Sequence, residues 1–385
     1  MKFSFSKKEC LLWCVSVAAG AVSLTGAALL TVTDDPAALM RLVGTYRLIH
    51  GEYFRTVSDT ELLDGASAGM VQALGDPYSG LVTGSDYDQF MQQTSGEYGG
   101  IGVVIGIDQE GIFRILAVFP ESPAEGAGIR PGDRVTAIDG KAVVPSEGGL
   151  DEAAHAIRGK SGTTVDVTIE RSGEEKTFSV TRSDITMPTV EGRMAEGDIG
   201  YIHIYSFSSH TADEFRKSYA ELAAQGMKKM IIDLRMNPGG MVDSVTAVAD
   251  QILTEGSVVS YQTKDGRTED FHIKGIEKPL PMVVLIDKNS ASASEILAGA
   301  VQDKKEGIIM GETSFGKGTV QVVHPIADRE VLKLSVAQYL TAAGRKIDKV
   351  GIVPDIAVPQ TGRLFDPASD SVYQAALAQL QDMQE

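Results

Sequence analysis

The 385-residue chain contains little cysteine and histidine, which excludes several kinds of site. Its two cysteines, Cys10 and Cys14, both lie in an apolar N-terminal stretch. The rest of the chain therefore holds no disulfide framework and no cysteine-based metal site. The six histidines are scattered and form no H-E-x-x-H or similar pair, which argues against a zinc hydrolase.

Positive charge is also scarce, with 35 lysines and arginines against 52 aspartates and glutamates and a net charge of −17. This balance argues against nucleic acid or an anionic membrane surface as a partner. The apolar content of 43% and the charged content of 23% are ordinary for a globular protein. Because the chain is too long for one ordinary core, two or three domains are expected.

The N-terminal segment, residues 1–35, predicts a membrane anchor. Residues 10–32 are apolar or small and carry no charge, which is long enough to span a bilayer. Lys2, Lys7 and Lys8 precede this span, so we expect that end in the cytoplasm and the remainder outside. We favour an uncleaved signal anchor, although residues 26–28 offer a weak cleavage site for a signal peptide.

Residues 36–95 predict a helical segment. Apolar side chains recur with helical spacing in residues 39–49 and again in residues 62–74, and Gly75, Asp76 and Pro77 then break the pattern. We expect these helices to pack together, and they offer a surface for a homodimer.

A serine cluster lies where a strand should give way to a helix. Residues 282–286 form an apolar run of buried-strand length, and apolar residues at 296, 297, 300 and 301 mark one helix face after the cluster. The first N–H groups of a helix lack intrahelical partners and favour negative charge. Ser292 could therefore attack a carbonyl while the following N–H holds the oxyanion. Alternatively, Ser292 and Glu295 form only a capping box.

A nucleophilic serine needs a base, and Lys317 is one candidate. It lies between Gly316 and Gly318 beside the apolar Phe315, so burial could lower its pKa enough for it to accept a proton. The competing interpretation is a solvated lysine in a glycine-rich turn. His324 is an alternative base, but nothing in the pattern matches it to that role.

Together the two stretches, Ser-Ala-Ser-Ala-Ser-Glu-Ile and the downstream Gly-Lys-Gly-Thr-Val-Gln, resemble the carboxy-terminal processing peptidases, the tail-specific proteases with a serine/lysine dyad. The resemblance covers nearly all of the chain after the N-terminal segment. It implies that Ser292 is the nucleophile, that Lys317 is the general base, and that Gln321 orients Lys317. It also implies that no metal and no cofactor are needed.

Residues 96–183 resemble a PDZ domain. A glycine-rich turn is followed by an alternating strand over 103–107, and later strings complete the resemblance: 122–124, 127–135 and 138–140. Free N–H groups in such a turn can hold a peptide's terminal carboxylate, and the strand edge can pair with an extended peptide. A helix over 150–158 would form the other wall. We expect binding at Tyr98, Gly99, Gly100, Ile101 and Gly102, although a plain glycine turn is the simpler interpretation.

Residues 184–360 predict the catalytic core. Strands over 200–204 and 230–235 alternate with helices over 211–224 and 242–253, which favours a largely parallel sheet. The resemblance implies an α/β, crotonase-like core with the PDZ domain inserted before it. It also implies an oxyanion hole made by the N–H groups of Gly239 and Ala293, with Gly240 as a near alternative. Residues 361–385 predict a C-terminal helical tail.

The expected function is that of a membrane-anchored serine endopeptidase, outside the cytoplasm, that cleaves protein substrates near their free C-termini. The alternative is a PDZ-containing binding protein that has lost catalysis, and the survival of Ser292, Lys317 and Gln321 at the family's spacing argues against it. Arg158 opens a string that recurs in the family. We expect it to couple peptide binding to the arrangement of Lys317, unless it only complements a helix dipole.

Overall fold

A computed structural model describes residues 33–84, 86–87, 90–91, 97–107, 111–143 and 149–383. The chain divides into two units at residues 81 and 82, and each is treated by itself. Most of the predicted anchor, residues 1–35, lies outside the described residues. Among the helices of the described part, none is long and apolar enough to cross a bilayer.

The described part of the first unit contains two helices, α2 (Pro36–Glu52) and α3 (Asp59–Gln72), as the periodicity predicts. The side chain of Asp35 caps α2 by accepting a hydrogen bond from the N–H of Ala38, and Ser58 and Glu61 form a capping box on α3. The helical pattern ends earlier than expected, because strand β1 (Gly80–Thr83) follows. Neither helix has a buried residue, so the homodimer surface stays a prediction.

The expected PDZ fold is built around a sheet with the order β3-β4-β5-β7-β8, with β6 paired to β5. Its strands are β3 (Val103–Ile107), β4 (Phe113–Val118), β5 (Arg134–Ile138), β6 (Lys141–Ala142), β7 (Thr164–Arg171) and β8 (Glu174–Thr181). Helices α5 (Pro123–Ala127) and α6 (Gly149–Ile157) contribute Ala124, Ala153 and Ile157 to the apolar core that these strands enclose. Strand β2 (Glu97–Gly100) pairs instead with β9 (Ser183–Thr186), at the other end of the domain's sequence.

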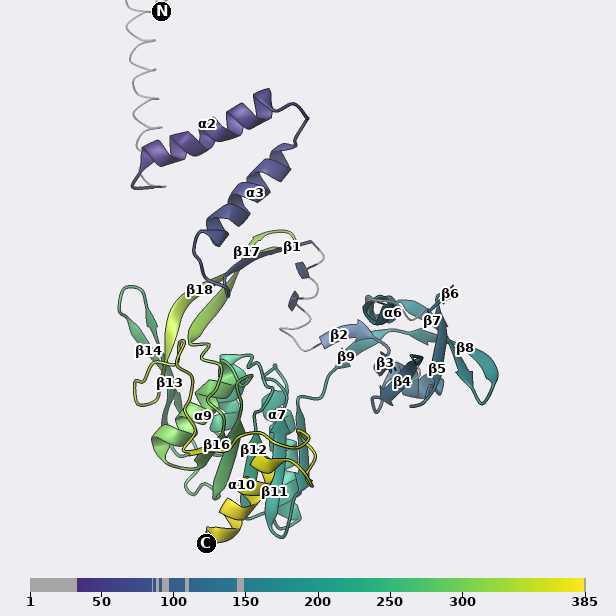
Figure 1. Cartoon of the computed structure of the whole chain (residues 1–385), viewed down its shortest axis with the longest axis vertical. Coiled ribbons are helices and arrows are strands. Elements are labelled where there is room, and N and C mark those ends of the chain that lie inside the picture. The colour runs from purple at the N-terminus through teal and green to yellow at the C-terminus, as the bar shows by residue number, and fades with distance from the viewer. Residues whose placement is uncertain are drawn as a thin grey trace, which may run out of the picture. The chain divides into compact units, whose positions relative to one another are not determined.

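The core domain is a six-stranded sheet with the order β10-β11-β12-β15-β16-β19 (Figure 1). Its strands are β10 (Val190–Met194), β11 (Ile199–Ile204), β12 (Lys229–Asp233), β15 (Met282–Ile286), β16 (Ile308–Gly311) and β19 (Ile356–Ala357). All neighbours are parallel except the antiparallel pair β10 and β11. The predicted parallel α/β sheet is confirmed.

Helices cover both faces of this sheet. Alternate residues of the strands, such as Ile232 and Val284, pack against α7 (Thr211–Ala224), α8 (Val242–Ala249) and α9 (Ala293–Lys304). The intervening residues, such as Ile231 and Val283, pack against α10 (Ser371–Asp382). This alternation follows from the period of two along a strand. The predicted C-terminal helix therefore belongs to the core.

A second sheet has five strands. Four of them are joined in antiparallel pairs: β13 (Gly256–Thr263), β14 (Thr268–Ile273), β17 (Thr319–Ala327) and β18 (Glu330–Thr341). Strand β18 pairs along one part with β17 and along another with β13. The alternating pattern over residues 331–340 therefore predicts this strand correctly. Because β17 begins two residues after Lys317, the sheet fixes the loop that carries the lysine.

His203 is a buried histidine whose protonation should affect stability. It is 5% exposed, its Nε2 has no hydrogen-bond partner in the described part of the chain, and its ring lies 4.1 Å from that of Tyr205 and 4.6 Å from that of Phe365 between centroids. Burial lowers the pKa of His203, and the nearby Asp233 opposes this only in part. The folded protein therefore holds the ring neutral at a pH where the unfolded chain already binds a proton.

The free energy of unfolding should accordingly fall as the pH drops below the ordinary histidine pKa of 6.5 toward the lowered value in the folded protein. His203→Phe keeps a ring between Tyr205 and Phe365 but cannot titrate, so its stability should fall less over this range. Urea unfolding at several pH values measures this, with the exposed His272→Asn as the control. An acid loss in His203→Phe as large as in the parent would show the inference to be wrong.

Candidate functional site

The turn between β15 and α9 places Ser292 at the first residue before the helix, as the sequence predicts. Ser292 is 7% exposed and has φ 54° and ψ −113°, a backbone conformation that few residues other than glycine adopt. The turn is held by Ser290, whose Oγ donates to the carbonyl of Leu234 at 2.8 Å. Such strain persists only where the surroundings fix it, and it is common at functional sites.

Glu295, in the first turn of α9, is a hydrogen-bonding centre for the whole site. Its carboxylate accepts hydrogen bonds from the N–H of Ser292 at 2.8 Å, of Gly316 at 2.7 Å and of Lys317 at 2.9 Å, and from the Ser314 hydroxyl at 2.5 Å. Glu295 is 1% exposed, and burial raises its pKa while these four donors oppose the rise. One buried carboxylate therefore joins the main chain of Ser292 to that of Lys317.

The capping box predicted for Ser292 and Glu295 is present, and it is compatible with a second role. The N–H of Glu295 donates to the main-chain carbonyl of Ser292 at 2.9 Å, so the Ser292 hydroxyl is at most a secondary acceptor for it. Sequence reasoning treated Glu295 only as a cap. The signal available in the sequence was a charged residue, Glu295, among small and apolar residues. The structure shows that the first nine residues of this helix are buried.

The loop that carries Lys317 is packed against the closing segment near residue 350. The carbonyl of Gly316 accepts from the N–H of Lys349 at 2.8 Å, and a Cβ on Gly318 would lie 2.1 Å from the main-chain N of Asp348. Glycine is therefore needed at 318 because the two main chains approach so closely. Lys317 is half-buried, whereas Phe315 is 56% exposed and does not supply the buried apolar neighbour that the sequence suggested.

Gln321 lies on β17, where its Nε2 donates to the carbonyl and hydroxyl of Thr319 at 3.0 and 2.8 Å and to the Ser335 hydroxyl at 3.2 Å. These bonds hold the Gln321 side chain against Thr319 and Ser335. The expected bond from Gln321 to Lys317 stays a prediction. His324 lies three residues further along β17. Because side chains alternate along a strand, this odd spacing points His324 to the opposite face from Gln321, and its side chain is exposed. This placement argues against the alternative base.

The loop after β12 reaches the start of α9. A Cβ on Gly239 would lie 2.7 Å from the Cβ of Ser292 and 2.8 Å from the N of Ala293, and the φ of Gly239 is +99°. The N–H of Gly239 donates to Oδ1 of Asn237 at 2.8 Å. Among the described residues, no acceptor is found for the N–H groups of Ala293 and Gly240. The geometry therefore favours Gly240 over Gly239 as the second free donor.

The predicted binding turn of the PDZ domain is held through its carbonyl groups. Those of Gly99, Ile101 and Gly102 accept hydrogen bonds at 2.9 Å from the N–H groups of Gly159, Ala124 and Phe119, respectively. No acceptor within the described part of the chain is found for the N–H groups of Ile101 and Gly102. For Tyr98 the structure gives only the main chain, which lies in β2 together with Gly99 and Gly100. The turn can thus present N–H groups to a carboxylate.

Arg182, which sequence reasoning missed, holds the end of the groove helix α6. It is 8% exposed, and its guanidinium donates to the carbonyl groups of Ala156 and Ile157 at 2.8 Å each and to that of Thr164 at 3.0 Å. A cation at this position satisfies the last carbonyls of the helix. Arg158 itself is exposed, and its proposed coupling role stays a prediction.

Three regions of the chain match models of known protein families. The family model described as Peptidase family S41 matches residues 198–358, and the PDZ domain model matches residues 114–171. A third model, described as the activating protease CtpB N-terminal domain, matches residues 23–83. The fold of a putative S41 protease from Bacteroides fragilis NCTC 9343 is similar, with 18% identity, a TM-score of 0.52, and coverage of 87% of this chain and 92% of that one.

Two curated relatives align with this chain over most of their length. The carboxy-terminal processing protease CtpB of Bacillus subtilis (strain 168) is 37% identical over 330 residues, covering 84% of this chain and 68% of the relative. The carboxy-terminal-processing protease of Bartonella bacilliformis is 33% identical over 331 residues, covering 84% of this chain and 75% of the relative. The chain therefore belongs to the carboxy-terminal processing proteases, which are serine-type peptidases.

Proposed function

We propose that this peptidase is an extracytoplasmic, membrane-anchored endopeptidase that binds the free C-terminus of a protein substrate and cleaves nearby with a Ser292–Lys317 dyad. The observation that carries the proposal is the buried carboxylate of Glu295, which accepts hydrogen bonds from the main-chain N–H of both residues. We assign the core to the crotonase-like folds on its sheet and helix order. The catalytically silent PDZ scaffold is less well supported, because the relatives are proteases.

In this mechanism the Ser292 hydroxyl attacks the scissile carbonyl while the neutral Lys317 amine accepts its proton. The lysine then gives that proton to the leaving amine. In the second half of the reaction the lysine takes a proton from the water that attacks the acyl-enzyme and returns it to the Ser292 oxygen as the ester bond breaks. The oxyanion forms beside the N–H groups of Ala293 and Gly240, two donors for which the described part of the chain offers no acceptor. Asn237 holds the loop in place, since it also donates to the carbonyl of Ile204 at 2.8 Å.

The PDZ domain would select the substrate end. The N–H groups of Ile101 and Gly102 are suited to a terminal carboxylate, and strand β3 and helix α6 form the two walls of the groove. A substrate with a free C-terminus would bind there while an upstream peptide bond reaches Ser292.

Ser292→Ala and Lys317→Ala should each abolish cleavage of an unfolded substrate such as casein while leaving the thermal unfolding temperature nearly unchanged. Loss of either member of a nucleophile–base pair removes almost all of the catalytic gain. Lys288→Ala, an exposed lysine in the turn before Ser292, is the matched control and should cleave normally. More than a few per cent of parental turnover in Lys317→Ala would show that another group is the base.

Glu295→Gln tests the positioning role. Glutamine fills the same space but places an NH₂ donor against N–H groups that need an acceptor, so Ser292 and Lys317 should shift relative to one another. Because a misplacement of about 1 Å can cost about 10²-fold in rate, kcat should fall by roughly that factor while KM changes little. If the activity fell only in proportion to the folded fraction, as judged by circular dichroism, Glu295 would have a structural role and no positioning role.

The membrane anchor follows from the uncharged residues 10–32 after three lysines. Protease added to spheroplasts should digest the chain from about residue 36 onward and leave the N-terminal lysines protected. Protection of the PDZ domain in intact spheroplasts would show that the chain has the opposite orientation in the membrane. A mature N-terminus near Ala28 would show that the segment is a cleaved signal peptide instead.

A further inference from the structure

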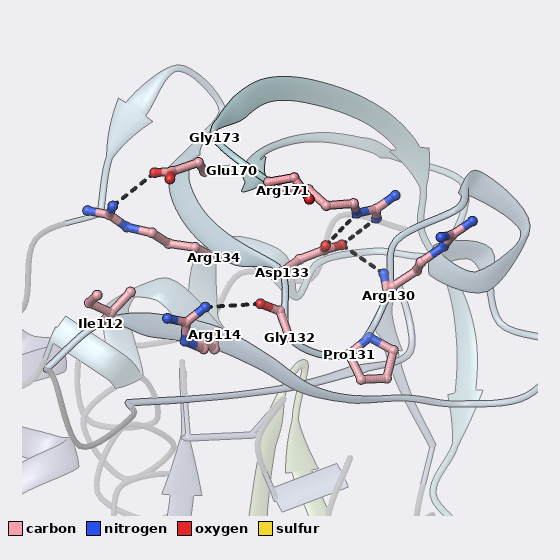
Figure 2. A pocket seen from close by; sticks show the side chains of 11 residues that line it. Ile112, Arg114, Arg130, Pro131, Gly132, Asp133, Arg134, Glu170, Arg171 and Gly173 are labelled. Carbon is pink, nitrogen blue, oxygen red and sulfur yellow. Dashed lines mark hydrogen bonds and ion pairs between the residues drawn. The ribbon is translucent and has the colours of Figure 1, made fainter.

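The PDZ domain has a hollow of about 490 Å³ that the function described so far does not use (Figure 2). Each of its two carboxylates is paired with an arginine. Nε and Nη2 of Arg171 donate to Asp133 at 2.7 and 2.6 Å. Nη1 of Arg134 donates to Glu170 at 2.9 Å. These pairs join β7 to β5 and to the residue before it, which is a structural role. The surface that still lacks a role is an edge of the second sheet.

Strand β17 forms an edge of the second sheet directly after the loop that carries Lys317. Within the described part of the chain, β17 pairs with β18 and with no other strand, so one side of its nine residues faces away from the sheet. The strand begins at Thr319, two residues after Lys317. The open side of an edge strand presents N–H and C=O groups with which an extended chain can pair.

The register of the strand pair shows which main-chain groups face outward. The N–H of Tyr339 in β18 donates to the carbonyl of Gly318 at 2.7 Å, so the main chain of the next residue, Thr319, faces away from β18. The extra residue at the first register shift lies on β18, which leaves the alternation along β17 intact. The N–H and C=O groups of Thr319, Gln321 and Val323 therefore point away from β18.

Two further observations support this orientation. The carbonyl of Thr319 accepts a hydrogen bond from Nε2 of Gln321 at 3.0 Å, so a side chain serves as its partner where a neighbouring strand would serve inside a sheet. Pro325 is in phase with these outward residues, and proline is accepted in an edge strand where its missing N–H would face away from the sheet. Pro325 also ends the run of outward donors, which leaves residues 319–323 as the stretch able to pair.

The composition of this edge differs from that of a protected edge. Natural edge strands are commonly guarded against pairing by charged side chains. At the other edge of the same sheet, β14 carries Glu269 and Asp270. Strand β17 contains no aspartate, glutamate, lysine or arginine, and its exposed side chains include Val322, Val323 and Ile326. The start of β17 is thus suited to pairing with another chain.

We propose that residues 319–323 of β17 bind the main chain of the substrate as an added β-strand. The identity of this chain as the substrate rests on the proposed peptidase function. Neighbouring strands lie about 4.8 Å apart, so a chain paired at Thr319 runs beside the loop of Lys317. Glu295 joins the main chain of that loop to the turn of Ser292. Pairing through the main chain holds the substrate extended and accepts many side-chain sequences.

The first test changes only the peptide. The probe is a fluorescein-labelled eight-residue peptide of alternating valine and threonine, amidated so that it lacks the terminal carboxylate that the turn at residues 98–102 would hold. Fluorescence anisotropy gives its Kd for the full-length Ser292→Ala chain, and a single N-methyl group is then placed at each position in turn. Because a strand pairs through alternate residues, the Kd should rise about fivefold at every second position and little in between. Absence of this alternation, or of saturable binding by the unmethylated peptide, would overturn the proposal.

A pair of substitutions then locates the binding on β17. Val323→Pro, added to this chain, removes one outward N–H and should raise the Kd about fivefold, whereas Val323→Thr keeps the N–H and the branched shape and should bind like the parent. Circular dichroism checks that both variants fold, and Thr319→Pro with Thr319→Val serves as the second pair if Val323→Pro does not. Equal Kd values within a folded pair would show that the peptide pairs elsewhere, such as at β3, and would contradict the proposal.

A second copy of this chain is the competing occupant of the edge. Light scattering measures the mass of the Ser292→Ala chain, and a doubled mass that Val323→Pro returns to that of one chain would show that β17 pairs with another copy, so the proposal would be wrong. Because peptide binding is measured without cleavage, its failure is distinct from failure of the proposed dyad. Loss of casein cleavage in Lys317→Ala tests the dyad alone, and peptide binding tests the strand edge alone.

Discussion

The buried carboxylate of Glu295 is the interaction on which the site depends. It accepts three main-chain N–H groups and one hydroxyl from two segments that are distant in sequence. A buried donor without an acceptor costs about 1–3 kcal/mol, so these four donors would be expensive to bury without the carboxylate. The same bonds offset the cost of burying the charge itself. One set of contacts therefore stabilises the fold and joins the main chain of Ser292 to that of Lys317.

Close approach of main chains completes the arrangement. Any side chain at Gly239 would collide with Ser292 and Ala293, and any at Gly318 would collide with Asp348. Glycine at 239 lets the loop after β12 reach the start of α9, and glycine at 318 lets the loop before β17 pack against the segment that contains Asp348. The positive φ of Ser292 is then imposed by a turn that is bonded on both sides, through Ser290 and through Glu295.

Much of this could be predicted from the sequence, because local patterns report local structure. The apolar run before the serine cluster and the helical spacing after it predicted β15 and α9, and strand–helix alternation predicted the parallel sheet. Sequence did not reveal the tertiary roles. The S-x-x-E string looked like a cap, and only the fold shows that Glu295 also bonds to Lys317. Likewise, the bond from Gly239 to Asn237 depends on how the loop turns, which no propensity records.

The C-terminal segment shows how the far side of the sheet supports the same site. Arg235, 1% exposed, follows β12 and donates to Asp233 and to Asp370. Asp370 also accepts the N–H groups of Val372 and Tyr373, so it caps α10 while it holds Arg235. Removing one partner of a buried ion pair typically costs about 3–5 kcal/mol, because the other charge stays buried and unpaired. The loop of residues 236–240 begins immediately after Arg235, so the position of the proposed oxyanion donor Gly240 depends on a helix that packs on the opposite face of the sheet from α9.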